Sequence, residues 1–222
     1  MGDGHHHDRP QGGPAVLTAP ARTAAPAGTG GRRPRAVLGL DVGAADLRAA
    51  DAVLQSLAGL PAEALACTQP IHGEHPHVAL TVEVPDRESA AVWALLCAAA
   101  DAVPGGGASW GYRRHGAAPA AEAAGAAAAA HALGRGRAVR FPGVGALTGT
   151  VTVGELLARS AIDRVALLGG GTADSAAQVA TRGRVRPERR TGELVLVVEE
   201  SAHGQLTPYE VPGPFDRRIV RG

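Results

Sequence analysis

The stretch HVALTVEVP, residues 77–85, alternates apolar and polar side chains, and the rest of the fold can be built outward from it. A period of two is typical of a β-strand that buries one face. The segment ALACTQPI, residues 64–71, is predicted to be a strand as well, joined to the first by the turn at 72–76. We expect one face of strand 77–85 to lie on the core (Val78, Leu80, Val82, Val84) and the other to face away (Ala79, Thr81, Glu83).

Upstream, a strand and a helix are predicted. AVLGLDV, residues 36–42, places Leu38, Leu40 and Val42 on one face. In AADLRAADAVLQSLAGLP, residues 44–61, apolar residues recur three and four apart, which indicates an amphipathic helix that Gly59 and Pro61 end. The predicted buried stripe is Leu47, Ala50, Val53, Leu54 and Leu57.

Downstream, Asp86 is a suitable N-cap for a helix over RESAAVWALLCAAADAV, residues 87–103. Its predicted buried stripe is Val92, Leu95, Leu96, Ala99 and Val103. After Pro104 and Gly105, ASWGYRR (108–114) can return as a strand. The order strand, helix, strand, strand, helix, strand resembles the ferredoxin-like βαββαβ sandwich, with two helices on one face of a four-stranded antiparallel sheet. The resemblance is to an element order that hosts many unrelated functions, and no motif names a family.

The chain divides by composition into five segments. Residues 1–34 are rich in Gly, Pro and Ala, which predicts a disordered tail, and residues 35–115 form the ferredoxin-like α+β domain. Residues 116–137 are rich in alanine and form either a linker or a helix. Helix propensity alone does not decide between the two. Residues 138–214 are predicted to be a small mixed α+β domain, and 215–222 a tail. The small domain contains a short helix with Thr152 and Glu155 in capping-box spacing, a strand at RVALLGG, and a C-terminal β-hairpin that pairs residues 179–185 with 194–198. QLTPYEVP (205–212) is predicted to add an edge strand.

Charge and composition exclude several classes of function. A net charge of +1 and 3% aromatic residues argue against bulk nucleic-acid binding. The segment 104–147 is nevertheless basic, with five arginines against one acid, whereas 35–103 has three against nine. No apolar run suggests a membrane span or an N-terminal signal, so we expect a cytoplasmic, soluble protein with no membrane partner. Cys67 and Cys97 lie in apolar segments, which favours buried thiols over a disulfide.

Three consecutive glycines, Gly169, Gly170 and Gly171, follow the apolar strand RVALL and raise the question of a phosphate-binding loop. Such a loop needs a following helix whose N-terminus stabilises the anion. The residues after the glycines turn quickly into a strand pattern, and Asp174 would repel a phosphate. We interpret the glycines as a tight turn with positive φ and keep an anion-binding turn as the alternative.

The segment IHGEHPH contains the densest group of metal-ligand residue types: His72, Glu74, His75 and His77. If it forms the turn between the two central strands, three of these side chains suit a zinc site with an open position. A solvated polar turn is the competing interpretation, so zinc stays a hypothesis and no other cofactor is expected. His5, His6 and His7 are interpreted as incidental.

Two arginine groups flank the alanine-rich segment: Arg113 and Arg114 with His115, and Arg135 with Arg137 and Arg140. If that segment doubles back, the groups form one basic pocket for a small acidic ligand. Solvated surface charge is the alternative. Arg182, Arg184 and Arg186 are predicted to alternate on the outward face of a hairpin strand, where they protect an edge.

No motif for nucleophilic catalysis occurs in the sequence. Whether the chain is an enzyme stays open, and we lean toward a non-enzymatic binding or regulatory protein of unknown ligand that forms a homo-oligomer. The alternatives are a zinc enzyme that uses His72, His75 and His77, and a module that binds a nucleotide or an acidic metabolite at the arginines and the glycine turn.

Overall fold

A computed structural model describes Met1, residues 34–201 and residues 204–210. The predicted tails at 1–34 and 215–222 lie outside the described residues, apart from Met1 and Pro34, and so do His5, His6 and His7. The described residues from Pro34 onward group into one compact unit by their contacts. The division into domains at 35–115 and 138–214 therefore stays a prediction.

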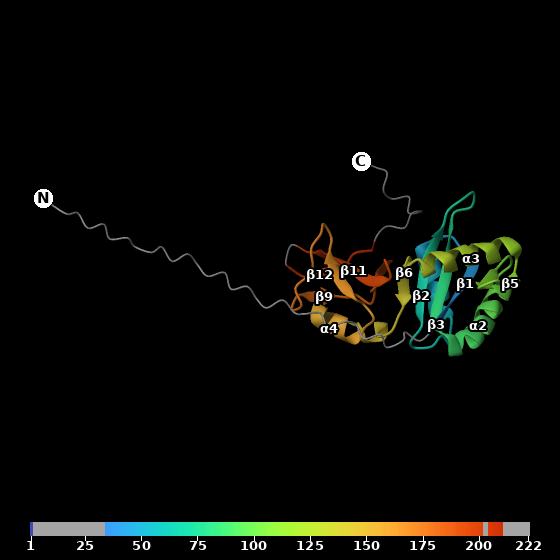
Figure 1. Cartoon of the computed structure of the whole chain (residues 1–222), viewed down its shortest axis with the longest axis horizontal. Coiled ribbons are helices and arrows are strands. Elements are labelled where there is room, and N and C mark those ends of the chain that lie inside the picture. Colours follow the sequence, from blue (N-terminus) through green and yellow to red (C-terminus); the bar gives the residue numbers. More distant parts are fainter. Residues whose placement is uncertain (2–33, 202–203, 211–222) are drawn as a thin grey trace. The chain divides into compact units, whose positions relative to one another are not determined.

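The protein is a mixed α+β structure with a large mixed sheet and four α-helices among its described residues (Figure 1). The strands are β1 (Arg35–Ala44), β2 (Leu65–Ile71), β3 (His77–Pro85), β4 (Gly107–Trp110), β5 (Arg113–Gly116), β6 (Arg137–Arg140), β7 (Thr150–Thr152), β8 (Arg164–Leu167), β9 (Gln178–Ala180), β10 (Glu188–Arg190), β11 (Glu193–Glu200) and β12 (Leu206–Pro208). The helices are α1 (Leu47–Ser56), α2 (Ser89–Asp101), α3 (Ala118–Ala132) and α4 (Val153–Arg159), with short 3-10 turns η1 (Asp86–Glu88) and η2 (Val144–Ala146).

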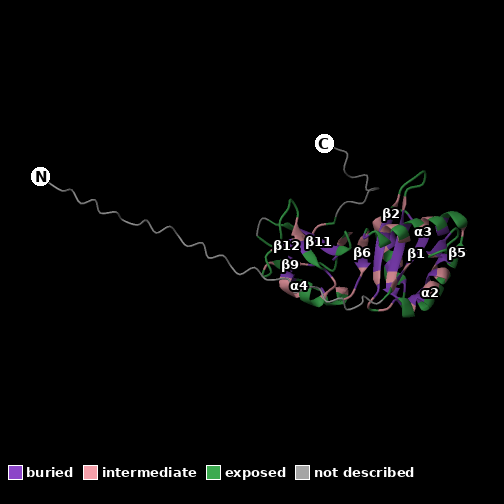
Figure 2. Cartoon of the chain, viewed as in Figure 1, coloured by how far each residue is buried: buried purple, intermediate pink, exposed green. Residues whose placement is uncertain are grey.

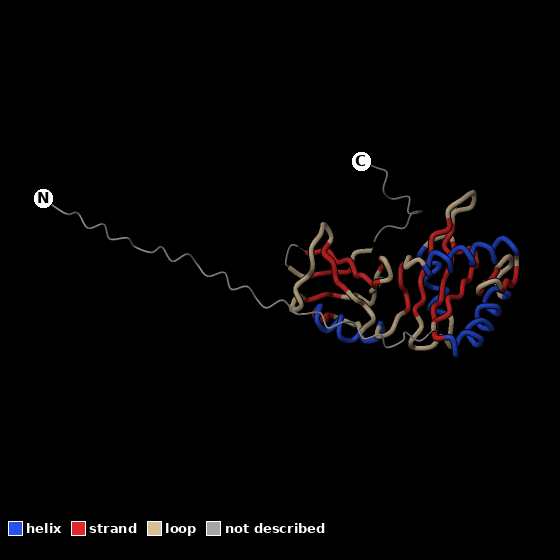
Figure 3. Tube along the Cα trace, in the orientation of Figure 1, coloured by secondary structure: helices blue, strands red, loops and turns tan. Residues whose placement is uncertain are grey.

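The sheet runs in the order β5-β4-β1-β3-β2-β6-β10-β11-β12-β9-β7, and β8 pairs with β11. From β5 to β11 all neighbours are antiparallel, whereas β8 with β11 and β9 with β12 are parallel pairs. The β2–β3 hairpin that residues 64–85 predict is present, with Ile71 opposite His77. Figure 3 shows these strands together with the helices that flank them.

The first hydrophobic core lies between this sheet and helices α1 and α2. Leu38, Leu40, Leu80, Leu54 and Leu96 are all fully buried there, and each contributes about 1.5–3 kcal/mol to the stability of the fold. Asp46 caps α1 by accepting a hydrogen bond from the Ala49 backbone N–H, at 2.7 Å. Helix α1 follows the predicted periodicity closely, because its apolar residues repeat on one face.

The start and end of α2 differ from prediction. Asp86 opens the turn η1, and α2 begins at Ser89 without a side-chain cap. The helix ends at Asp101, so Val103 is 37% exposed and does not belong to the buried stripe. The segment 108–114 forms parts of two strands, because Gly111 at φ +56° reverses the chain between β4 and β5.

The side of the sheet that carries Ala79, Thr81 and Glu83 is predicted to point away from the protein, but in the structure it is covered. Ala79 and Thr81 are fully buried, because α3 lies across this face. The alanine-rich segment is thus a helix over Ala118–Ala132. Figure 2 shows the concentration of buried residues in the strands that α3 crosses.

A second core holds the C-terminal half together, around Phe141, Leu156, Val165, Leu196 and Val198. The predicted capping box is confirmed: Thr152 accepts from the Glu155 N–H, and the Glu155 carboxylate accepts from the Thr152 N–H. The predicted hairpin partner at 179–185 is wrong. Positive φ at Arg182 and Gly183 ends β9, and the strand that pairs with β11 in a hairpin is β10.

Two further predictions for the C-terminal half are wrong. Strand β12 is internal, between β11 and β9, and is not an edge strand. Arg182, Arg184 and Arg186 do not alternate on a strand, since none of them lies in one. In the part of the chain that the structure describes, no helix has the length and apolar character needed to cross a membrane.

Candidate functional site

The β4–β5 hairpin ends the sheet, because β5 is the last strand of the order and pairs only with β4 among the described residues. Its register places Arg113 opposite Trp110, Arg114 opposite Ser109 and His115 opposite Ala108. Side chains alternate along a strand, so Arg113 and His115 lie on the face that α2 covers. Arg114 lies on the α3 face, where its guanidinium approaches the backbone of Gly125.

Aromatic side chains gather beside this edge. Both tryptophans of the chain are here, Trp93 on α2 and Trp110 on β4, with ring centroids 6.3 Å apart. The Arg113 guanidinium lies over the Trp110 ring at 5.0 Å, a cation–π contact, and Tyr112 in the turn is 95% exposed. Three of the six aromatic residues are therefore in one small region. We call Trp93, Trp110, Tyr112, Arg113, Arg114 and His115 the edge surface.

His115 connects the edge surface to the end of α2. Its Nε2 lies 2.7 Å from an Asp101 carboxylate oxygen, and its ring meets Trp93 edge to face at 6.5 Å. Cys97, one turn before Asp101, is a weak nucleophile because partial burial and the Asp101 charge raise the pKa of its thiol against the effect of Arg113. The arrangement presents flat apolar rings and cations, which suits binding more than chemistry.

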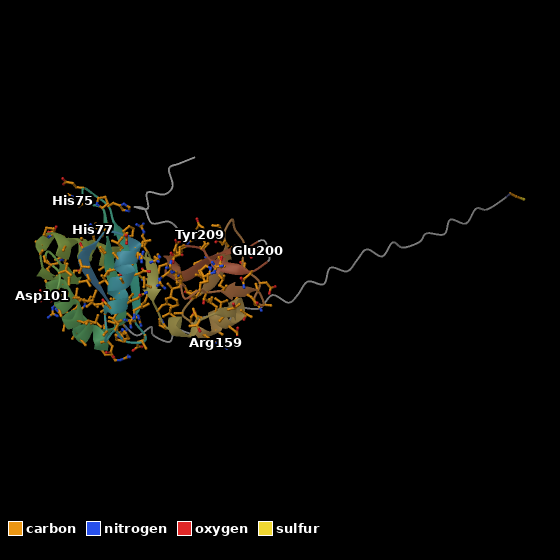
Figure 4. All side chains as sticks on the ribbon, turned by 180° about the vertical axis from the view of Figure 1, so that it is seen from behind. His75, His77, Asp101, Arg159, Glu200 and Tyr209 are labelled. Carbon is orange, nitrogen blue, oxygen red and sulfur yellow. The ribbon has the colours of Figure 1, made fainter. Side chains whose placement is uncertain are left out.

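The predicted zinc residues lie on and beside the projecting β2–β3 hairpin, where Figure 4 labels His75 and His77. His77 Nδ1 is 2.7 Å from the His75 carbonyl oxygen, and Nε2 is 2.8 Å from the buried carboxylate of Asp41. Burial lowers the pKa of His77, but these two hydrogen bonds and the Asp41 charge outweigh it and raise that pKa. Both ring nitrogens of His77 therefore have oxygen partners within the fold.

No three His, Cys, Asp or Glu side chains within the described residues are grouped so that they could hold a metal ion. The zinc hypothesis for His72, Glu74, His75 and His77 remains a prediction for another conformation of this hairpin.

The predicted basic residues are separated by the sheet. Arg113 and Arg114 lie on β5, whereas Arg137 and Arg140 lie on β6, five positions away in the strand order, or about 24 Å at normal strand spacing. Arg137 makes a bidentate ion pair with Asp51 (2.6 and 3.1 Å), and Arg140 donates to the Leu57 carbonyl. The six residues therefore do not meet in one pocket in this structure.

Gly169, Gly170 and Gly171 form a turn after β8 with φ of +94°, +112° and +93°. The Gly170 N–H donates to the Leu167 carbonyl, and the Leu167 N–H donates to the Gly171 carbonyl. The next regular element is β9, so no helix N-terminus follows the glycines. Anion binding at this turn stays a prediction without the helix that usually supports it.

A buried polar cluster under α3 was not foreseen from the sequence. His131 has no exposed surface; its Nε2 donates to Glu83 (2.9 Å) and its Nδ1 lies 2.8 Å from the Thr81 hydroxyl. Arg35 and Arg189 also bind the Glu83 carboxylate, at 2.7 and 3.3 Å. A single histidine in an otherwise alanine-rich helix, and a glutamate in an apolar strand, were the available signals.

Electrostatics assign the protonation states of this cluster. The hydrogen bond from His131, the charge of Arg189 and the hydrogen bond from Arg35 outweigh burial and lower the pKa of Glu83 to about 2. Burial, the largest effect, outweighs the Glu83 contact and lowers the pKa of His131. A neutral His131 with its proton on Nε2 accepts from the Thr81 hydroxyl at Nδ1. Burial also raises the pKa of the neighbouring Cys67 to about 12, so this thiol stays protonated.

This cluster resembles a catalytic triad in residue type only, because Thr81 and His131 are both fully buried. Hydrogen bonds that join His131 to Thr81 and Glu83, and one from Arg189 to the His131 carbonyl, hold α3 to the sheet, although the buried Arg189 Nε has no partner among the described residues. The edge surface is thus the strongest candidate for contact with another molecule. Comparisons of the chain with protein-family models, with curated proteins and with solved structures give no match.

Proposed function

We propose that this protein is a non-enzymatic binding protein that holds another polypeptide at the edge surface. The observation that carries the proposal is the placement of both tryptophans, an exposed tyrosine and two exposed arginines beside an open sheet edge. Trp, Tyr and Arg are the residues that dominate the energetics of protein interfaces. An open edge also offers unpaired backbone groups to a second chain.

The other candidate groups are held by carboxylates within the fold, whereas Arg114 of the edge surface donates to the Gly111 and Arg113 carbonyls at the hairpin turn, which favours the edge surface by comparison. Both ring nitrogens of His77 have oxygen partners, so zinc could bind this side chain only after one of these two hydrogen bonds is broken. Arg137 is held by Asp51, so an acidic metabolite would compete with an existing bidentate pair.

We further propose that residues 35–115 are ferredoxin-like and that 138–214 form a smaller α+β domain in a cytoplasmic protein. The antiparallel order β4-β1-β3-β2, with α1 and α2 on one face, supports the first part. Two free cysteines support a reducing compartment. We also propose that two or more copies of the chain associate, through surfaces other than the β5 edge.

Selection of random peptides on the immobilised full chain tests the proposed function. We expect enriched peptides whose affinity falls at least about tenfold, or 1.4 kcal/mol, in the double variant Tyr112→Ala, Arg113→Ala. Both side chains are exposed, so the variant should fold normally. The matched control is Leu168→Ala, Arg159→Ala, which removes an exposed apolar and an exposed basic side chain elsewhere.

Binding can be followed without a label, since both tryptophans of the chain lie in the edge surface and should change their fluorescence. Failure to enrich any peptide, or equal loss of affinity in the control variant, would refute a binding role for this surface.

A further inference from the structure

We infer that the segment bound at the edge surface is an extended, acidic stretch of another polypeptide, which adds a strand to β5. This inference rests on the proposed function and names the chemistry of its partner.

The backbone of β5 supports strand addition. Its four residues pair with β4 on one side only among the described residues, and three of the four are exposed. In an antiparallel pair, alternate residues turn their N–H and C=O groups away from the partner strand. The N–H and C=O groups of alternate residues in β5 therefore point outward, where an extended peptide can form hydrogen bonds with them.

Charge selects the chemistry of that peptide. Arg113 and Arg114 are exposed, and the segment 104–147 that contains them has five arginines and one acid. On the α2 face, Asp101 is already paired with His115. Acidic residues on a neighbouring strand would lie beside the two arginines, and opposite charges across strands stabilise a pair.

The alternation of β5 makes the expected pattern more specific. Arg113 lies on the α2 face and Arg114 on the α3 face, so one acid on each face is needed. Neighbouring residues of an added strand also point to opposite faces. The partner should therefore carry two adjacent acidic residues within an extended segment.

A second copy of this chain fits the same edge poorly. An antiparallel pair of two β5 strands that is centred on Arg114 sets the arginines of the two copies directly opposite each other. Like charges directly opposite each other destabilise strand pairing. An acidic partner removes this repulsion.

The experiment uses peptides enriched on the full chain and synthesised with a fluorescent label, with affinity measured by anisotropy. We expect the sequences to contain adjacent Asp or Glu residues, and amide replacement of both acids to weaken binding at least about tenfold. Methylation of alternate peptide nitrogens should abolish binding, because it removes the donors of a strand ladder.

Charge reversal provides the decisive arm. The variant Arg113→Glu, Arg114→Glu should lose the acidic peptides and gain affinity for versions in which lysines replace the acids. Its matched control is Arg48→Glu, Arg184→Glu, which reverses two exposed arginines distant in sequence from β5 and should bind like the wild type. Circular dichroism checks that each variant is folded.

The outcomes separate this inference from the proposed function. Peptides that need Tyr112 and Arg113 but tolerate loss of their acids, or N-methylation, overturn strand addition by an acidic segment and leave the binding function in place. Peptides with no dependence on the edge surface overturn both. Labelled oligothymidylate that binds more tightly than any peptide and is lost in Arg113→Glu, Arg114→Glu would make the partner a nucleic acid.

Discussion

At the scale of single residues, the cluster around Glu83 shows how this protein buries charge. The Glu83 carboxylate accepts hydrogen bonds from His131, Arg35 and Arg189, three residues far apart in the sequence. An unpaired buried carboxylate would be costly, and these partners compensate for its lost hydration. A neutral His131 is part of the arrangement, since it accepts from Thr81 while it donates to Glu83.

We expect the free energy of unfolding to fall as the pH drops below 6.5, the ordinary histidine pKa. Burial holds the pKa of His131 below that value, so the unfolded chain takes up a proton that the folded chain does not. Urea unfolding between about pH 8 and pH 5 measures the effect, and the slope should be shallower in His131→Gln.

His77 provides a control of opposite sign. Its folded pKa is raised, so its contribution to stability is fully present below 6.5 and is lost as the pH rises through the folded value. The acid-dependent loss should therefore be steeper in His77→Gln. Glu83 does not interfere, because its lowered pKa of about 2 affects stability only below its ordinary value of 4.5. An unchanged slope in His131→Gln would contradict the assignment of a neutral His131.

At the scale of elements, α3 packs through its backbone more than through its side chains. The buried positions Ala120, Ala124, Ala127 and His131 recur at helical spacing. Because alanine is short, the helix comes close to the strands beneath it: a Cβ on Gly39 would lie 2.0 Å from the Ala124 carbonyl oxygen, and one on Gly107 2.4 Å from the Ala121 nitrogen. Small residues on both elements are what make the contact possible.

Gly39→Ala should therefore destabilise the protein by about 1–3 kcal/mol, because the added methyl group has to push α3 away from the sheet. Chemical denaturation measures the change. Gly145→Ala is the matched control, since no atom lies within 4 Å of the added Cβ there, and we expect a change within about 0.5 kcal/mol. Equal effects of the two substitutions would show that α3 does not press on β1.

At the scale of the whole described unit, the N-terminal half, built around the first hydrophobic core, meets the C-terminal half, built around the second core, along β2, β6 and α1. Strand β6 joins the sheet beside β2, and Asp51 of α1 binds both Arg137 and Arg186. Arg140 donates to the Leu57 carbonyl at the end of the same helix. The side-chain contacts of Asp51 and Arg140 join residues that are 83 to 135 positions apart in the sequence.

Asp51→Asn should lower the free energy of unfolding by about 2–3 kcal/mol, since Arg186 loses its carboxylate partner and Arg137 keeps only a 3.6 Å contact with the more exposed Glu210. The loss should also uncouple the halves, so amide protons of β11 should exchange faster relative to those of β1 and β3. Glu193→Gln, which removes an exposed ion pair with Arg164, serves as the control and should cost less than about 1 kcal/mol. A uniform increase in exchange over all three strands would argue against a coupling role for Asp51.

The sequence alone determined the elements whose apolar side chains repeat on one face. Strand 77–85, its hairpin partner, helix α1 and the capping box at Thr152 all follow from local periodicity or from contacts a few residues long. The sequence also indicates part of the candidate site, since Arg113 and Arg114 stand out as a basic group, whereas Arg137 and Arg140 lie on a distant strand of the sheet.

Only the tertiary structure decided what covers the second face of the sheet and where the sheet ends. Alternation shows that Ala79 and Thr81 are on the face opposite Leu80, but not that a helix of alanines buries them. Likewise, the tryptophans are 17 residues apart in numbering and become neighbours only because β4 returns beside α2. Local patterns record which side chains avoid water, whereas the packing partners depend on contacts between distant segments, and these determine both the buried cluster and the edge surface.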